Sequence, residues 1–428
     1  MRQKSRNRLK EKKNSGAPGE IRTPDLLLRR QSLYPTELRA RALQVYIWLP
    51  GMAREDGAQQ ITIPVVSLSF SVLIPSRLNL LLKGPCLLWL RRIVFTVALI
   101  VALVLTIWSA AALFFDSPFP ALRTPAAIAY LIVILAAVFL LRRNHLGIIV
   151  AFAGFALVAL WWFSLKPLSD RDWQPDDART AWADINGDEV TIHNVRNCDY
   201  VTEKEYTCHW ETRNYNLATI RGADIFITWW GPTLIAHPIV SFDFGEQGHV
   251  PMSIETRDEV GQGYSAIRGF FRQYALIYIV SDERDVIRLR TNFRKDEEVY
   301  LFRTTATPAL ARKVFLDYLQ RVNELNRQPE WYNAVTNNCT TNIAVAAAEA
   351  QHKEVRHDWR ILLNGKMDEM MYENGGLVTG GLPLPALKAQ AHINDAARAA
   401  DDSAEWSKLI RVGRVGFSDQ RGSVAVSH

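Results

Sequence analysis

One cysteine stands in a context that favours nucleophilic chemistry. Cys339 lies in YNAVTNNCTTNIAVAA, where Asn and Thr residues cluster just before an apolar, alanine-rich stretch of strong helix formers. The pattern predicts that the thiol lies at or near a helix N-terminus, where free N–H groups and the helix dipole stabilise an anion. A thiolate formed there is a nucleophile, and the same N–H groups can hold an oxyanion. The alternative is a buried, inert cysteine that packs as a small hydrophobic residue.

A cysteine nucleophile needs a base. The histidines after residue 166 are His193, His209, His237, His249, His352, His357, His392 and His428. His237 opens an expected β-hairpin (residues 237–256), and a strand can hold an imidazole rigidly beside a helix N-terminus. We expect His249 to be solvated in the hairpin turn, and His352 and His357 to lie too far along the cysteine helix. His392 stays a candidate, and each histidine also has an ordinary structural or surface interpretation.

Glu255 is the candidate that orients the base. It lies on the strand that returns after His237, and with a turn centred near Gly248 it becomes a diagonal cross-strand neighbour of His237. The alternative is a surface carboxylate paired with Arg257.

A second pair of cysteines, Cys198 and Cys208, flanks DYVTEKEYT, which we interpret as a loop or hairpin. An oxidising compartment permits a disulfide between them, which would stabilise the domain by about 2–3 kcal/mol. The alternative is that both are reduced. The Cys and His spacings form no zinc pattern, and no Walker loop or G-x-G-x-x-G occurs, so we expect neither a metal nor a cofactor.

The elements around these residues predict a mixed domain from residue 166 to 400, followed by a tail over 401–428. Alternating or apolar runs predict strands, and helical spacing predicts helices at 308–326 and 342–351. Beside the hairpin, the expected strands are 187–197, 224–230, 275–280 and 297–303. Strands with a few helices indicate an α+β domain, and the Ala-rich helix follows directly on Cys339.

A membrane region precedes this domain, over residues 76–165. Three apolar runs, at 93–115, 125–142 and 145–165, are of the length that crosses a bilayer, and the third ends in two tryptophans typical of the interface. A buried core helix is the alternative for each. Basic residues precede the first run and separate the second from the third, so the positive-inside rule places the N-terminus in the cytoplasm and the domain outside, in the periplasm of a Gram-negative cell.

The N-terminal segment accounts for the basic character of the chain. Its first 51 residues contain twelve basic and four acidic residues, a net charge of +8 against +6 for all 428 residues, so the remainder is net acidic. This distribution removes the main support for a nucleic-acid partner. We interpret residues 1–75 as a disordered tail or as translated non-coding sequence upstream of the true start.

Several motifs together resemble one family. The stretches NVRNCDY, WETRNYNL, HPIVSFDFGEQGHVPMSIETR, YNAVTNNCTTNI and AHINDAARA resemble the Lnb N-terminal periplasmic domain family over roughly residues 180–400. The three preceding spans resemble its inner-membrane branch. The resemblance implies a permuted papain-like or NlpC-like fold, with an antiparallel sheet and a cysteine-bearing helix. It matches Cys339 to the motif cysteine and His237 to the motif histidine, whereas Cys198 and Cys208 depart from the family pattern.

These observations predict a membrane-anchored periplasmic acyltransferase or hydrolase that uses Cys339. One class in the family is linked to N-acylation of lipoproteins through a cysteine thioester, although this chain lacks a long second module. The expected substrate is an acyl ester, thioester or amide in an envelope lipoprotein, lipid or peptide, and the expected partner is the lipid bilayer. The alternative is a degenerate papain-like module for envelope binding or assembly, without catalysis.

Overall fold

The computed structural model describes residues 85–142, 145–167, 169–231, 234–354 and 358–417. The segment 1–75, with its interpretation as a disordered tail or as translated non-coding sequence, lies outside the described residues. So do His357 and His428.

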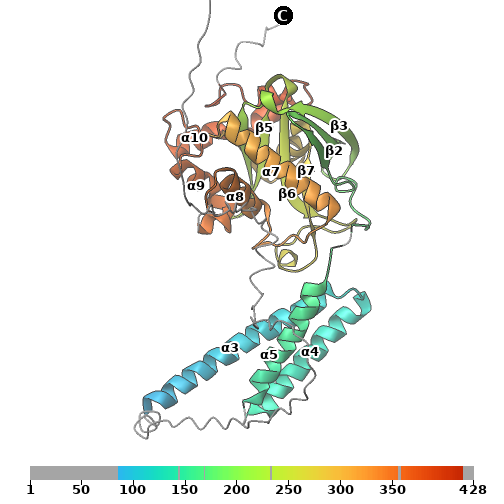
Figure 1. Ribbon diagram of the computed structural model, residues 1–428, viewed down its shortest axis with the longest axis vertical. Coiled ribbons are helices and arrows are strands. Elements are labelled where there is room, and N and C mark those ends of the chain that lie inside the picture. Colours follow the sequence, from blue (N-terminus) through green and yellow to red (C-terminus); the bar gives the residue numbers. More distant parts are fainter. Residues whose placement is uncertain (1–84, 143–144, 168, 232–233, 355–357, 418–428) are drawn as a thin grey trace, which may run out of the picture. The chain divides into compact units, whose positions relative to one another are not determined.

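Three long helices confirm the expected apolar spans (Figure 1). They are α3 (Pro85–Asp116), α4 (Pro120–Leu140) and α5 (Leu146–Ser164), and each is long and apolar enough to cross a membrane. Helix α4 begins five residues before its expected start, because Pro120 occupies the first turn, where its missing N–H costs no hydrogen bond. A Cβ on Gly147 would lie 2.5 Å from the Cα of Val138, so glycine permits the close approach of α5 to α4.

The rest of the described chain forms two antiparallel sheets with helices, which confirms the α+β class. The first sheet has the order β1-β2-β3 and the second the order β7-β6-β5-β4-β8. All neighbouring strands in both sheets are antiparallel. The strands are β1 (Trp182–Asn186), β2 (Glu189–Tyr200), β3 (Tyr206–Asn216), β4 (Gly222–Trp230), β5 (Ala236–Asp243), β6 (His249–Arg257), β7 (Ala275–Val280) and β8 (Glu297–Arg303).

Helices cover both faces of the five-stranded sheet. On one face α7 (Pro308–Arg327) packs Phe315 and its neighbours against Phe242, in a core that also includes the first sheet and the start of α8 (Cys339–Ala350). On the other face Ile239 packs against α6 (Glu283–Arg288), α11 (Asn394–Ala400) and α12 (Trp406–Leu409). Strand residues alternate between the two cores because their side chains point to opposite faces. Two shorter helices, α9 (Met367–Glu373) and α10 (Leu384–Ala391), contribute to a third cluster.

A buried ion cluster attaches the C-terminal segment to the sheet. The side chain of Arg411 has no exposed surface, and its Nη2 lies 2.8 Å from Asp224 Oδ2 on β4 and 2.6 Å from Glu283 Oε1 on α6. Trp406 and Ile410 are fully buried beside it. The residues that we assigned to a tail therefore include some that pack in the core of the domain.

Removing Arg411 tests this attachment. Arg411→Ala leaves Glu283 buried without its ion-pair partner and leaves Asp224 with Arg303 alone, so we expect a loss of about 3–5 kcal/mol in unfolding free energy. Thermal unfolding of the solubilised full-length chain measures it. Lys408→Ala is the control: Lys408 is half exposed and pairs with Glu405 at the surface, so its loss should cost less than about 1 kcal/mol. Equal losses of unfolding free energy in the two variants would contradict the role of Arg411 in attaching the C-terminal segment.

Candidate active site

Cys339 occupies the first position of helix α8. A capping box fixes that start: the side chain of Asn338 accepts a hydrogen bond from the Thr341 N–H (2.9 Å), and the Asn338 N–H donates to Thr341 Oγ1 (3.0 Å). The helix thus begins three residues earlier than the expected Asn342. The thiol therefore lies at a helix N-terminus, where the backbone of Thr340 acts to lower its pKa.

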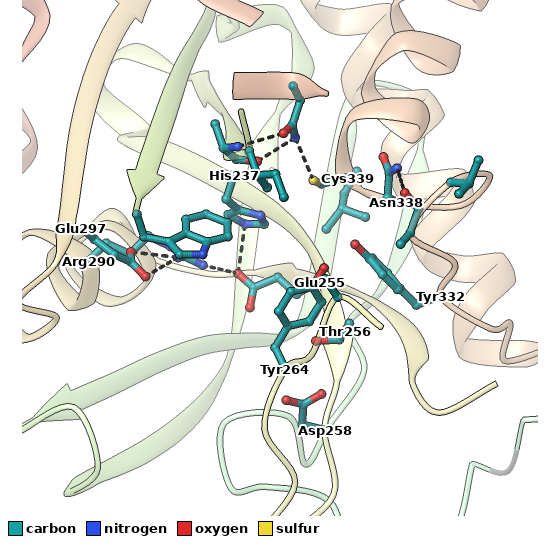
Figure 2. Close-up of a pocket in the computed structure, with 18 of the residues that line it drawn as sticks. His237, Glu255, Thr256, Asp258, Tyr264, Arg290, Glu297, Tyr332, Asn338 and Cys339 are labelled. Carbon is teal, nitrogen blue, oxygen red and sulfur yellow. Dashed lines mark hydrogen bonds and ion pairs between the residues drawn. The ribbon is translucent and has the colours of Figure 1, made fainter. Parts of the chain in front are cut away.

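His237 lies between Cys339 and Glu255. Its Nε2 is 2.8 Å from Ser253 Oγ and 3.5 Å from Glu255 Oε1. The imidazole and the Cys339 thiol lie close enough that each shifts the pKa of the other. Figure 2 shows the three side chains converging from β5, β6 and the start of α8. The structure thus brings together the three residues singled out in the sequence.

The register of the hairpin differs slightly from our expectation. The pairs run from Asp243 opposite His249 to Ile239 opposite Ser253, so the turn is centred on Glu246 and not on Gly248. Continuing this register places Glu255 directly opposite His237, not diagonal to it. Direct opposition brings the two side chains closer.

The expectation for His249 is wrong. Its side chain is only 8% exposed, and its Nε2 lies 3.9 Å from Asp224 and 4.0 Å from Asp243. The hairpin turn packs beside the Arg411 cluster, because the C-terminal segment covers that end of the sheet. His392 lies outside the cavity of Cys339 and bonds to Glu298.

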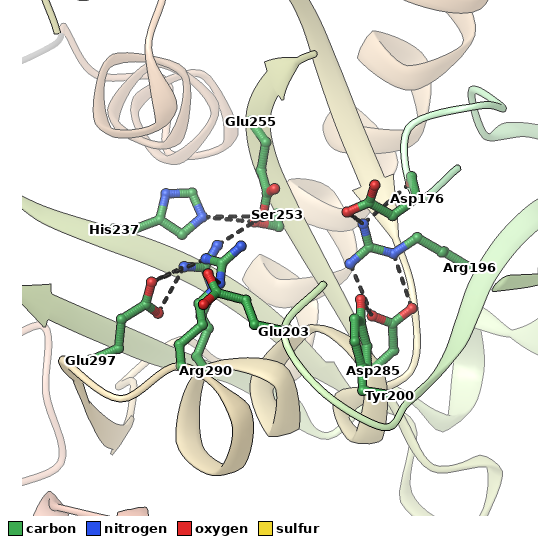
Figure 3. A network of polar contacts seen from close by, with 11 residues as sticks. Asp176, Arg196, Tyr200, Glu203, His237, Ser253, Glu255, Asp285, Arg290 and Glu297 are labelled. Atoms are coloured by element: carbon green, nitrogen blue, oxygen red, sulfur yellow. Dashed lines mark hydrogen bonds and ion pairs between the residues drawn. The ribbon is translucent and has the colours of Figure 1, made fainter. Parts of the chain in front are cut away.

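Arg290 is a site residue that the sequence did not reveal. Its Nη2 lies 3.1 Å from Glu255 Oε1 and its Nη1 lies 3.0 Å from Glu297 Oε2. Both ion pairs can be followed in Figure 3. Arg257, which the alternative interpretation paired with Glu255, instead donates to the carbonyls of Asp177 and Ala178. Arg290 lies in a short π-helical segment, Leu289–Phe293, directly after α6. Such turns have no sequence pattern, although they are frequent at functional sites.

Charges and hydrogen bonds shift the pKa values of all three residues. Burial and the Arg290 charge act to lower the pKa of His237, but its interactions with Cys339 and Glu255 outweigh them and raise it. Burial acts to raise the pKa of Cys339, yet His237 and Thr340 lower it below the ordinary thiol value. Burial is likewise outweighed at Glu255, where His237 and Arg290 hold the pKa well below its usual range. The geometry favours a thiolate beside an imidazolium.

Asn364 holds the His237 strand against the Cys339 helix. Its Oδ1 accepts from the Ala236 N–H (2.8 Å), and its Nδ2 donates to the Ala236 carbonyl and to Thr340 Oγ1, both at 2.6 Å. Nδ2 also lies 3.8 Å from Cys339 Sγ. Because Ala236 precedes His237 and Thr340 follows Cys339, this buried amide fixes the spacing of the two reactive groups. The sequence showed no pattern that pointed to Asn364.

These residues line a cavity of about 490 Å³. Apolar and aromatic side chains line it, among them Tyr264, Phe270, Tyr332, Val335 and Leu362, together with the acidic Asp176 and Asp258. In the described part of the chain, no group of three or more His, Cys, Asp or Glu residues is arranged to hold a metal ion. The cavity has room for an organic substrate beside the thiol.

Cys198 and Cys208 are direct cross-strand partners in the β2–β3 hairpin, and a disulfide joins them. The hairpin is attached to α6 because Asp285 accepts from the Cys198 N–H (3.0 Å) and pairs with Arg196 (2.9 Å). Neither cysteine lines the cavity of Cys339. The oxidation state of this pair in the cell stays a prediction.

The thiol pKa gives a direct test of the His237–Cys339 pair. A lowered pKa makes thiolate available below the ordinary pH range of a thiol, so iodoacetamide should alkylate Cys339 at pH 7. In His237→Ala the pKa rises, and we expect the alkylation rate at pH 7 to fall on the order of tenfold. Rate against pH, followed by peptide mass spectrometry of Cys339, measures the shift. His392→Ala serves as control; equal profiles for both variants would refute the pairing.

Comparison with known proteins finds one family. Residues 206–365 match the family model described as the Lnb N-terminal periplasmic domain. The match includes His237, Glu255 and Cys339, and it confirms the resemblance seen in the motifs. No curated protein and no solved structure matches the chain.

Proposed function

We propose that this chain, which contains an Lnb N-terminal periplasmic domain over residues 206–365, is a membrane-anchored, cysteine-dependent acyltransferase or hydrolase of the cell envelope. One observation supports this most strongly: Cys339, His237 and Glu255 converge in one cavity, with a pKa pattern that favours a thiolate–imidazolium pair. A cysteine kept only for packing needs no imidazole beside it and no carboxylate behind that imidazole.

The first half-reaction is acyl transfer to sulfur. The Cys339 thiolate attacks the substrate carbonyl, forming a C–S bond and a tetrahedral oxyanion. Backbone N–H groups at the start of α8 stabilise that charge. When the intermediate collapses, the C–O, C–S or C–N bond to the leaving group breaks, and His237 donates its proton to that group. A thioester on Cys339 remains.

The second half-reaction regenerates the thiolate. His237, now neutral, accepts a proton from an incoming amine, alcohol or water as this nucleophile attacks the thioester carbonyl. The C–S bond then breaks and the acyl group leaves with the acceptor. Glu255 orients the imidazole through Ser253 and stabilises its charged form, and Arg290 keeps Glu255 ionised. Transfer and hydrolysis differ only in the acceptor.

The order of the elements fits a permuted papain-like arrangement. The histidine strand β5 precedes the cysteine helix α8 in sequence. Helices able to span a membrane favour a substrate held in or at the bilayer, such as a lipid or lipoprotein, since the cavity belongs to a tethered domain. A peptide substrate of the envelope fits the same chemistry.

An acyl adduct on Cys339 is the expected product of the first half-reaction. Intact mass of the full-length chain purified from membranes, followed by peptide mapping, should show an added acyl group on Cys339 that neutral hydroxylamine removes. Cys339→Ala should lack the adduct and Cys86→Ser should retain it. Absence of any adduct after incubation with membrane lipids, together with alkylation indifferent to His237, would support a non-catalytic binding module instead.

We further propose that the N-terminus is cytoplasmic and the domain periplasmic. Basic residues before the first span and between the second and third support this orientation. A phosphatase reporter fused after residue 166 should be active, whereas one fused at residue 143 should be inactive. The reverse pattern of reporter activity would contradict this orientation, but it would not bear on the reaction proposed for Cys339.

A further inference from the structure

The loop between β6 and β7, residues 258–274, exposes an unusual amount of apolar surface. Its exposed side chains are Val260 at 58%, Tyr264 at 49%, Ile267 at 64% and Phe270 at 46%. Large apolar side chains grouped on one loop indicate a contact surface, because single ones scattered over a protein are ordinary but clusters are not.

The loop is ordered, so these side chains are held outward. The Gly269 N–H donates to the Ser265 carbonyl (2.9 Å), and the Ala334 N–H donates to the Gly269 carbonyl (2.8 Å). The Tyr274 hydroxyl accepts from the Ser265 N–H and donates to the Gly263 carbonyl, both at 2.9 Å. These bonds fix the backbone while Ile267 and its neighbours stay uncovered.

The loop is continuous with the ends of the membrane-spanning helices. Phe271 stacks on Phe115, in the last turn of α3, with ring centroids 4.8 Å apart. The Arg272 N–H donates to Asp116 Oδ1 (3.1 Å), and its guanidinium lies 4.3 Å from the ring centroid of Trp162 near the end of α5. Tryptophan at a span end marks the level of the lipid headgroups. Phe270 is adjacent to Phe271 in the chain and therefore lies close to that level.

Positively charged side chains lie in or near the same loop. Arg268, within the loop, is exposed, and so is Lys166, two residues after the end of α5. Apolar side chains with neighbouring cations are the combination that binds the boundary between acyl chains and phosphate headgroups.

We propose that the β6–β7 loop inserts its exposed apolar side chains into the bilayer surface on the domain's side of the membrane. The occupant of this surface is lipid, in the same bilayer that the spanning helices cross. Tyr264 and Phe270 also line the cavity of Cys339, so insertion places one wall of that cavity at the lipid surface. The inference rests on exposure and continuity with the spans, and holds whether or not Cys339 is catalytic.

An environment-sensitive label at Ile267 tests the insertion. Ile267→Cys, in a full-length background with Cys86→Ser and Cys339→Ser, is labelled with a nitrobenzoxadiazole maleimide and reconstituted into phosphatidylcholine–phosphatidylglycerol vesicles. Val412→Cys is the matched control. Val412 is 46% exposed and adjoins Arg411 at the His249 end of β6, roughly 26 Å along that strand from the Arg257 end where the loop begins.

Nitroxide lipids spin-labelled in the acyl chain should quench the fluorescence of the label at position 267 at least twofold more than that of the label at position 412. Arg268→Glu should reduce that difference in vesicles containing phosphatidylglycerol and leave it unchanged in pure phosphatidylcholine. Equal quenching at the two positions would overturn the proposal. Blue-shifted emission at Ile267 without nitroxide quenching would also overturn it, because it would indicate burial against protein.

Discussion

The meeting of an imidazole and a thiol, more than a hundred residues apart in the chain, is the constraint that organises the domain. It requires the first residues of β5 and α8 to meet within a few ångströms. The Asn338 capping box fixes where α8 begins, and Asn364 joins the backbone before His237 to the side chain after Cys339. A misplacement of about 1 Å can cost a reactive pair on the order of a hundredfold in rate, and the buried hydrogen bonds of Asn364 oppose such a displacement.

Burying this pair requires compensation for charge. The Glu255 carboxylate is taken out of water, and it is stabilised by His237 on one side and Arg290 on the other. Arg290 in turn is paired with Glu297, so charges alternate outward from the sulfur. A second alternating cluster, Arg411 with Asp224 and Glu283, lies at the opposite end of the sheet and holds the C-terminal segment. Ionised groups remain buried only where such partners exist.

The membrane helices do more than anchor the domain. Asp116, at the end of α3, accepts hydrogen bonds from Trp162 on α5 and from Arg272 and Gln273 directly before β7. The sheet that supplies Glu255 is therefore connected to the spans through one strand. Since β7 pairs with β6 along its whole length, the membrane end and the reactive groups belong to one continuous hydrogen-bonded unit.

The sequence by itself determined whatever depends on local pattern. Apolar length specified the three spans, and apolar or alternating runs specified β7 and β8 to the residue. The Asn–Thr cluster before an Ala-rich run placed Cys339 at a helix start. His237 and Glu255 were identified because a hairpin links them within twenty residues. Tertiary structure alone decided the rest: the partner of Glu255 became Arg290 and not Arg257, His249 became buried, and Asn364 joined strand to helix. Those contacts unite segments distant in the chain, and periodicity carries no information about which distant segments will pack together.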